Sequence, residues 1–221
     1  TARTYAGEDG LLNIEREVEL SGPIHDKGVL ILHSHLSALF AHIAPLALNA
    51  AVVFEQEYSG VEGDSASCAE FYALLSSLSG LPIRQGIAVT GAINQHGEVQ
   101  PVGGINEKIE GYFRSCEQLG LDGQQGVLIP RRNARHLMLD AKVVAAVAQG
   151  RFHIHTANTV GEGMAFLTGL PFGDEAAVLY AAESVLGRAQ KKLQAFRRAC
   201  MALHAHAPVA SPKRRVRLVR A

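Results

Sequence analysis

The sequence is poor in cysteine. Its 221 residues include only Cys68, Cys116 and Cys200, and no two of them are spaced as CxxC. An odd number of cysteines without that spacing argues against both a disulfide framework and a zinc ribbon. Because disulfides are rare in reducing compartments, the low cysteine content leads us to expect a cytoplasmic protein.

A long uninterrupted apolar run is also missing. The most apolar stretch, residues 29–53, is broken by three histidines, a proline and an asparagine, and the first ten residues show no basic segment followed by an apolar one. A membrane-spanning helix needs about 20 mostly apolar residues, and a signal peptide needs a basic and then an apolar region. We therefore expect neither a signal peptide nor a membrane span.

Acidic residues are absent from the C-terminal part of the chain. From residue 188 onward there are ten basic residues and no acidic ones, whereas residues 1–187 carry 11 basic and 21 acidic residues. We expect an acidic domain over residues 1–172, a helical extension over residues 173–206 and a basic flexible tail over residues 207–221. Such a tail could contact nucleic acid, but a short basic run is more often a solvated terminus.

The hydrophobic pattern predicts alternating strands and helices. A content of 48% hydrophobic and 19% charged residues is typical of a globular protein. The order of the predicted strands and helices along the chain indicates a mixed α/β or α+β fold, with mixed sheets packed against helices. The predicted strands are residues 12–20, 51–56, 83–93, 127–129 and 152–156, with a hairpin return after the turn NQHG, and the predicted helices are 26–44, 65–78, 104–119, 133–149, 160–168 and 174–204.

The densest candidate for chemistry is the segment GVEGDSAS, residues 60–67. Gly60 and Gly63 permit a sharp bend that places Ser65 at the start of a predicted helix. N–H groups in a first helical turn lack partners within the helix, and the helix dipole favours negative charge there. An oxyanion beside Ser65 could be stabilised at this position. The simpler alternative is that Asp64 or Ser65 only caps the helix.

A second candidate is PVGGINEK, residues 101–108, in which Gly103 and Gly104 precede a predicted helix that carries Lys108. Lysine can replace histidine as the base that activates a serine, provided that its amine is neutral and within hydrogen-bond reach of the hydroxyl. The alternative is a surface lysine paired with Glu107 or Asp64.

Three motifs together resemble the proteolytic domain of the Lon proteases: GDSAS, then TGAI from Thr90, then GGINEK ending at Lys108. The resemblance covers roughly residues 11–169. It implies a Lon-type fold and a catalytic dyad of Ser65 as nucleophile and Lys108 as general base, with Thr90 orienting the lysine. It also implies supporting roles for residues around the dyad, namely Glu62, Gly63, Asp64, Gly103 and Gly104.

The acidic residue before the serine suggests a further hypothesis. A carboxylate close to an ammonium stabilises the charged form, so an ion pair between Asp64 and Lys108 would hold the dyad inactive until substrate or oligomer contacts break it. We also expect Val61, Glu62 and Ile105 to help shape the substrate pocket.

The resemblance further implies a ring-shaped homohexamer that cleaves unfolded or damaged proteins with the help of an ATPase module. The chain contains no GxxxxGK[ST] motif, so we expect no nucleotide site and no cofactor within it. ATP would act through a module outside this sequence. The alternatives are a peptidase that works without nucleotide and a Lon-fold binding or assembly module with little activity of its own.

Three HxH pairs raise the question of metal binding: His33 and His35, His153 and His155, and His204 and His206. Imidazoles two residues apart share one face of a strand, but no cysteine or carboxylate accompanies them at ligand spacing. We expect packed or solvated histidines and no metal. A Ser-His-Asp site is not expected either, because the sequence has no GxSxG-like motif.

Overall fold

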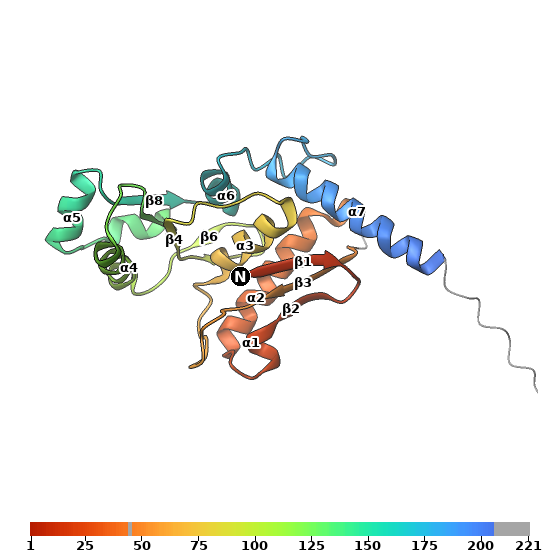
Figure 1. The fold of residues 1–221 in the computed structure, drawn as a ribbon, viewed down its shortest axis with the longest axis horizontal. Helices are drawn as coiled ribbons and strands as arrows, with labels where there is room; N and C mark the ends of the chain where they lie inside the picture. Colours follow the sequence, from red (N-terminus) through yellow and green to blue (C-terminus); the bar gives the residue numbers. More distant parts are fainter. Residues whose placement is uncertain (44–45, 206–221) are drawn as a thin grey trace, which may run out of the picture.

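The computed structural model describes residues 1–43 and 46–205, with side chains up to residue 203, so the predicted basic tail at 207–221 lies outside the described residues (Figure 1). Within these residues the first sheet has the order β1-β3-β2. Its outer strand β1 is antiparallel to the central strand β3, and β2 is parallel to it. The strands are β1 (Ala2–Ala6), β2 (Gly10–Asn13) and β3 (Leu48–Val52).

The second sheet has the order β4-β7-β8 and is parallel throughout. Its strands are β4 (Ile87–Val89), β7 (Gly126–Pro130) and β8 (His153–Ala157). The predicted hairpin is confirmed: β5 (Ala92–Ile93) and β6 (Val99–Gln100) pair in antiparallel fashion, and Gly97 has a φ of 72° in the turn between them. That left-handed conformation favours glycine.

Helices pack against the sheets, so the predicted class of mixed sheets packed with helices is confirmed. Figure 1 shows α3 between the N-terminal sheet with α2 and the second sheet with α4 and α5. The α-helices are α1 (Ile14–Glu17), α2 (Pro23–Leu39), α3 (Ser67–Ser79), α4 (Ile105–Leu119), α5 (Ala141–Ala148), α6 (Val160–Thr168) and α7 (Val185–Ala205), and the 3-10 helices are η1 (Ala41–Ile43) and η2 (Arg131–His136).

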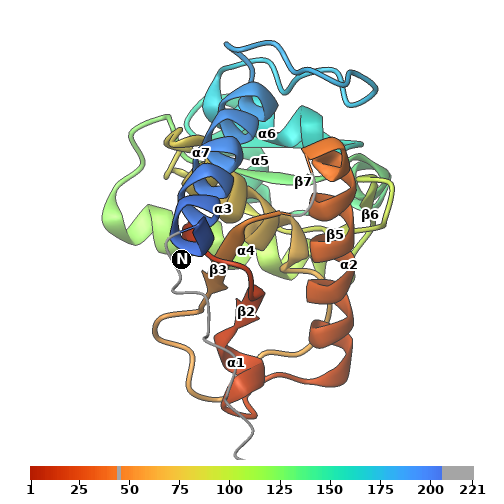
Figure 2. The same ribbon diagram turned by 90° about the vertical axis from the view of Figure 1, so that its right-hand side faces the viewer.

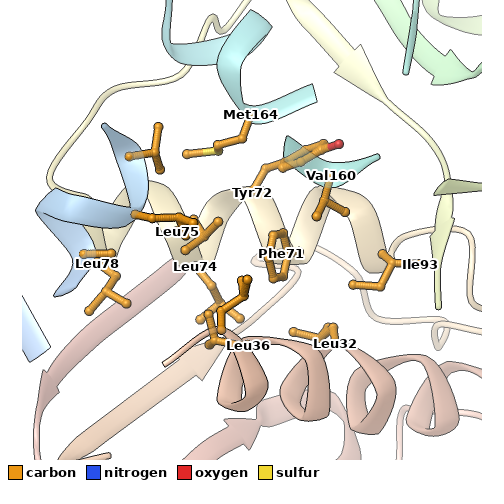
Figure 3. Packing of buried hydrophobic residues seen from close by; sticks show 14 of the residues in the cluster. Leu32, Leu36, Phe71, Tyr72, Leu74, Leu75, Leu78, Ile93, Val160 and Met164 are labelled. Atoms are coloured by element: carbon orange, nitrogen blue, oxygen red, sulfur yellow. The ribbon is translucent and has the colours of Figure 1, made fainter. Parts of the chain in front are cut away.

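Helix α3 forms the centre of the larger hydrophobic core. Its Phe71 and Leu75 are fully buried. Leu32 of α2 contributes to this core from one side, and Met164 of α6 contributes from the other (Figure 3). Burying each such side chain stabilises the fold by about 1.5–3 kcal/mol. Because α3 begins two residues after Ser65, this core holds the candidate nucleophile on a rigid element.

A second core lies between α4, α5 and the second sheet. It contains Ile109 and Phe113 of α4, Ile129 of β7, Val143 of α5 and Phe152, all nearly fully buried. Phe113 and Phe152 meet edge to face, with ring centroids 5.3 Å apart. This core fixes the face of α4 beside Lys108 against β7.

Helix α7 packs onto the domain. Val185, Leu186, Ala189 and Leu193 are buried in the same core as α3, and α7 lies beside α3 in Figure 2. Among the described residues, no helix combines the length and the apolar character needed to cross a membrane.

The predicted strand at residues 12–20 is wrong beyond Asn13. The Asn13 side chain caps α1 by accepting a hydrogen bond from the main-chain N–H of Arg16 at 3.4 Å. Glu15 turns inward and accepts a hydrogen bond from the N–H of Phe54 at 2.6 Å. The local cap at Asn13 and the long-range hydrogen bond to Glu15 together favour a helical turn over the strand that the alternating pattern suggested.

The predicted helix at 174–204 is wrong in its first part, because α7 begins at Val185. Ser184 caps this helix, since its hydroxyl accepts a hydrogen bond from the N–H of Gly187 at 3.0 Å. The predicted helix at 133–149 is divided into η2 and α5. Glu110 of α4 accepts a hydrogen bond from the N–H of Asp140 and so holds the intervening segment outside both helices.

Smaller differences concern the ends of elements and one missed strand. Helix α2 begins at Pro23, at a first position that suits proline, and not at the expected residue 26. The strand expected at residues 51–56 lies at Leu48–Val52, where β1 pairs with it. Strand β1 itself was not predicted.

Candidate active site

The segment around Ser65 is tied to the segment that follows β4. The main-chain carbonyl of Ser65 accepts a hydrogen bond from the N–H of Gly91 at 2.9 Å, and the N–H of Cys68 donates to the carbonyl of Gly91 at 3.1 Å. The buried hydroxyl of Ser67 accepts a hydrogen bond from the N–H of Ile93 at 3.0 Å. Helix α3 was expected to start at Ser65 but starts at Ser67, so Ser65 lies at the junction just before the helix.

These contacts also divide the strand expected at residues 83–93. β4 pairs with β7, whereas β5 pairs with β6. Between them, Thr90 and Gly91 bond to β7 and to the serine segment instead of continuing one ladder. The break in the strand therefore places Thr90 beside Ser65.

The loop before Ser65 is held by the segment that leads into α2. The N–H of Val61 donates to the carbonyl of Leu20 at 2.8 Å, and the N–H of Gly22 donates to the carbonyl of Val61 at 2.9 Å. The carboxylate of Glu62 lies against Gly22, where any Cβ would meet it. Gly63 adopts a φ of 84°, which accommodates the bend before the serine.

Lys108 approaches Ser65 from the first turns of α4. Gly104 caps this helix with a φ of 65° and accepts a hydrogen bond from the N–H of Lys108 at 3.0 Å. The amine Nζ of Lys108 lies 3.1 Å from Ser65 Oγ and 3.3 Å from Thr90 Oγ1. The structure thus brings together three side chains that are 18 to 43 residues apart in the sequence.

Thr90 connects the other two side chains. Its hydroxyl accepts a hydrogen bond from Lys108 and donates one to the carbonyl of Ser65 at 3.4 Å. Its own N–H donates to the carbonyl of Leu128 in β7 at 3.2 Å. Ser65 and Thr90 are half-buried, whereas Lys108 is exposed in the single chain.

Asp64 does not pair with Lys108 among the described residues. The ion pairs there are His25 with Glu70, Arg131 with Glu162 and Arg188 with Glu183. Asp64 is exposed, and its negative charge disfavours the thiolate form of Cys68. Burial and, less strongly, Asp64 raise the pKa of the Cys68 thiol to about 12. Cys68 is therefore a neutral thiol at pH 7 and does not compete with Ser65 as a nucleophile.

An apolar pocket opens directly beside these groups. It has a volume of about 330 Å³. It is lined by Ser65, Ala66, Ala88, Val89, Thr90, Lys108, Ile109, Tyr112, Val127 and Ile129. Of the residues expected to shape a pocket, Ile105 is buried in the second core, and Val61 and Glu62 lie against the segment before α2.

Sequence reasoning missed the apolar lining of this pocket, although the signal was present. Val127 and Ile129 are two residues apart on β7, so they point to the same face of the sheet. Tyr112 follows Lys108 by four residues and shares its face of α4. The hydroxyl of Tyr112 donates to the carbonyl of Gly86 at 3.0 Å, which anchors the ring beside β4.

The histidine pairs make no metal site within the residues that the structure describes. No group of three histidine, cysteine, aspartate or glutamate side chains there is placed to hold a metal ion. His153 Nε2 lies 2.8 Å from the carbonyl of Gly123, and His35 Nδ1 lies 3.2 Å from the carbonyl of Gln95. Burial lowers the pKa of His155. The pair His204 and His206 lies outside the described side chains.

Residues 59–168, about half of the chain, match the C-terminal proteolytic domain of Lon protease (S16). Through this segment the chain belongs to the Lon protease family. The matched segment contains Ser65, Thr90, Lys108 and the complete lining of the pocket. The family supports a peptidase domain with the fold described above.

Curated relatives agree with this family. The chain is 44% identical over 171 residues to a protein of Escherichia coli K12 named "Putative Lon protease homolog", and 42% identical over 169 residues to a protein of the same name from Haemophilus influenzae. These alignments cover 77% and 76% of the chain but only 29% and 28% of the relatives. An archaeal Lon protease of Archaeoglobus fulgidus is 40% identical over 91 residues, 41% of the chain and 14% of that protein.

Proposed function

We propose that the domain is a serine endopeptidase in which Ser65 is the nucleophile and Lys108 is the general base and acid. The observation that carries the proposal is the distance of 3.1 Å between Lys108 Nζ and Ser65 Oγ. This distance lies within the range for direct proton transfer between a base and a nucleophile.

The reaction proceeds in two steps. The neutral amine of Lys108 takes the proton of Ser65 as Oγ attacks the peptide carbonyl, and the resulting ammonium gives that proton to the departing amine. The acyl group then remains on Ser65. Lys108 next takes a proton from water, which attacks the ester, and returns a proton to Ser65 Oγ as the acid product leaves.

The oxyanion of each tetrahedral intermediate needs hydrogen-bond donors at the start of α3. The N–H groups of Ser67 and Cys68 already donate to Asp64 and Gly91. We therefore assign this role to the N–H groups of Asp64 and Ser65, where the positive end of the helix dipole adds to the stabilisation.

Lys108 must lose its proton before it can act as a base, and burial favours the neutral form of an amine. In the single chain its side chain is exposed. We propose that a bound peptide and neighbouring subunits cover it, in a homohexamer like that implied by the resemblance. The chain spans less than a third of the two bacterial relatives, which supports a larger protein with room for an ATPase module.

The pocket indicates the class of substrate. Its walls are mainly alanine, valine, isoleucine and tyrosine side chains, so it suits an apolar side chain next to the scissile bond. Apolar side chains are buried in folded proteins and become accessible on unfolding. Unfolded or damaged proteins are therefore the substrates that we propose.

The first test is cleavage of casein, an unfolded protein, without nucleotide. Ser65→Ala and Lys108→Met are compared with two matched surface variants, Ser115→Ala and Lys142→Met. We expect the first two to lose activity by about a thousandfold or more, a loss typical of removing a nucleophile or its base, and the matched variants to retain activity.

A labelling experiment covers the case in which cleavage needs the ATPase module. A fluorescent fluorophosphonate reacts with an activated serine hydroxyl and needs no unfolding of substrate. We expect it to label the wild-type chain, to label Lys108→Met much more slowly and not to label Ser65→Ala. A wild-type chain that neither cleaves casein nor reacts with the probe would favour the binding or assembly module over the peptidase.

A further inference from the structure

Asn133 makes a close contact with the chain just before the helix that carries Lys108. Its side-chain oxygen accepts a hydrogen bond from the N–H of Val102 at 3.0 Å, and its side-chain nitrogen donates to the carbonyl of Val102 at 2.9 Å. Asn133 is only 5% exposed. The Asn133 amide thus bonds both the N–H and the carbonyl of Val102, as the backbone of a neighbouring β-strand would.

The segment that Asn133 holds leads through two glycines to Ile105, and the side chains of Val102 and Ile105 both pack in the second core. Val102 is followed by Gly103 and Gly104, and glycine is the residue with the greatest backbone freedom. A Cβ added at Gly103 would meet nothing within 4 Å, and one at Gly104 would meet only the Glu107 carboxylate at 3.8 Å. Neither glycine has side-chain packing of its own, so the two hydrogen bonds at Val102 act together with the packing of Val102 and Ile105 to place the start of α4.

Asn133 itself belongs to a fixed part of the fold. It lies on η2, which directly follows β7, the central strand of the second sheet. β7 also accepts the main-chain hydrogen bond from Thr90, through the carbonyl of Leu128. The same strand therefore holds Thr90 directly and the start of the Lys108 helix through Asn133.

We propose that Asn133 is a positioning residue for the Ser65–Lys108 pair, because it holds Val102 and so fixes the start of α4 relative to β7. The inference rests on the proposed peptidase function. Proton transfer between Lys108 and Ser65 requires the two side chains to stay within hydrogen-bond reach. A small shift of the first turn of α4 would lengthen the 3.1 Å contact.

Helix α4 retains further attachments when Asn133 is replaced. Asn106 accepts a hydrogen bond from the N–H of Met138 at 2.9 Å, and Glu110 accepts one from the N–H of Asp140 at 2.9 Å. Ile109 and Phe113 remain packed in the second core. Loss of Asn133 should therefore displace the first turn of α4 without unfolding the helix.

The test compares Asn133→Leu, which removes both hydrogen bonds at similar size, with Asn133→Asp, which keeps the acceptor for the Val102 N–H. The matched control is Asn49→Leu in β3. The Asn49 amide likewise makes two bonds, to the N–H and the carboxylate of Asp9, both at 2.8 Å. All variants are made in the full chain, and thermal unfolding, casein and peptide cleavage and fluorophosphonate labelling are measured for each.

We expect Asn133→Leu to lower kcat and the labelling rate about 10- to 100-fold with KM changed less than about threefold, as for a misplaced catalytic group. Asn133→Asp should lower kcat and the labelling rate by a smaller factor. Asn49→Leu should lower the midpoint of thermal unfolding but leave the labelling rate of the folded protein within about twofold of the wild type, since Asn49 lies on β3 and belongs to neither the pocket lining nor the second core.

The outcomes separate this inference from the proposed function. A wild-type chain that neither cleaves casein nor reacts with the probe overturns both. A reactive wild-type chain with an inactive Ser65→Ala variant supports the function. In that case, an Asn133→Leu variant whose labelling rate matches that of Asn49→Leu, or that changes only KM, shows that Asn133 has a purely structural role and overturns the inference.

Discussion

His25 on α2 and Glu70 on α3 form a buried pair, in which His25 Nε2 lies 3.0 Å from Glu70 Oε1 and neither side chain is more than 3% exposed. The second ring nitrogen, Nδ1, lies 2.8 Å from Ser21 Oγ, and Ser21 donates to Asp26. The hydrogen bond to Glu70 raises the pKa of His25 above its ordinary value. Burial opposes this shift, and the charges of Glu70, Asp26 and Glu15 add to it.

The pair predicts a pH-dependent stability. A histidine whose pKa is higher in the folded state contributes its full stabilisation below the unfolded pKa of about 6.5 and loses it as the pH rises through the folded pKa. Glu70→Gln removes the charge at constant size. We expect it to lower the free energy of unfolding by about 1.5–3 kcal/mol at pH 6, and by less at pH 9. Urea unfolding from pH 6 to pH 9 measures both values.

The control for this prediction is Glu183→Gln, which breaks an ion pair in which the glutamate side chain is 88% exposed. Exposed pairs contribute little to stability, so the free energy of unfolding of this variant should match that of the wild type at every pH. A Glu70→Gln deficit that stays constant from pH 6 to pH 9 would contradict the assignment of the charge to His25.

Thr90 is expected to orient Lys108. Thr90→Val preserves the shape of the side chain and removes the hydroxyl that contacts both Lys108 and the Ser65 carbonyl. We expect kcat to fall about 10- to 100-fold, as for a misplaced base, while the free energy of unfolding changes by about 1 kcal/mol or less, as for one hydrogen bond. Thr90→Ser keeps the hydroxyl and should retain most of the activity. A Thr90→Val variant that keeps the kcat of the wild type would show that the hydroxyl does not orient Lys108.

Ala88 is expected to set the size of the accepted side chain. It lines the pocket beside Ser65 on β4. Ala88→Leu fills part of the 330 Å³. Each methylene that is denied burial costs a substrate about 0.8 kcal/mol, so kcat/KM for peptides with Phe or Leu next to the scissile bond should fall about tenfold or more relative to peptides with Ala. Mass spectrometry of casein fragments provides a second readout. If Ala88→Leu leaves the set of cleavage sites unchanged, the substrate side chain next to the scissile bond does not bind in this pocket.

The sequence was most informative where short-range chemistry decides the structure. Gly104 could be placed at the start of a helix because the helical pattern begins after it, and the structure starts α4 at Ile105. The hairpin around Gly97 followed from the turn NQHG. The association of Ser65, Thr90 and Lys108 came from a resemblance, because spacing alone does not show which helix faces which strand.

The features that sequence reasoning missed depend on distant partners. The turn at Glu15 is favoured by a hydrogen bond to Phe54, 39 residues away. Asn133 holds Val102 across 31 residues. Neither contact leaves a periodic signal, because an asparagine or glutamate has the same local sequence pattern whether its partner is water or distant backbone.

Gly103 and Gly104 offer a matched pair of substitutions in front of Lys108. Gly104 has a φ of 65°, a conformation that costs a residue with a Cβ about 1–2 kcal/mol. Gly103 does not adopt this conformation, and a Cβ there meets no atom within 4 Å. Replacing a glycine at such a compatible site reduces the freedom of the unfolded chain and stabilises a protein by about 0.4–1 kcal/mol.

We therefore expect opposite effects from the same change. Gly104→Ala should lower the free energy of unfolding and, because the strain falls on the cap of α4, also lower kcat. Gly103→Ala should leave kcat close to wild type and keep or raise stability. Urea unfolding and peptide cleavage of both variants test this directly. A loss of activity in Gly103→Ala without a loss of stability would mean that the stretch before α4 must move during the reaction, which would contradict the fixed position that we assign to it through Asn133.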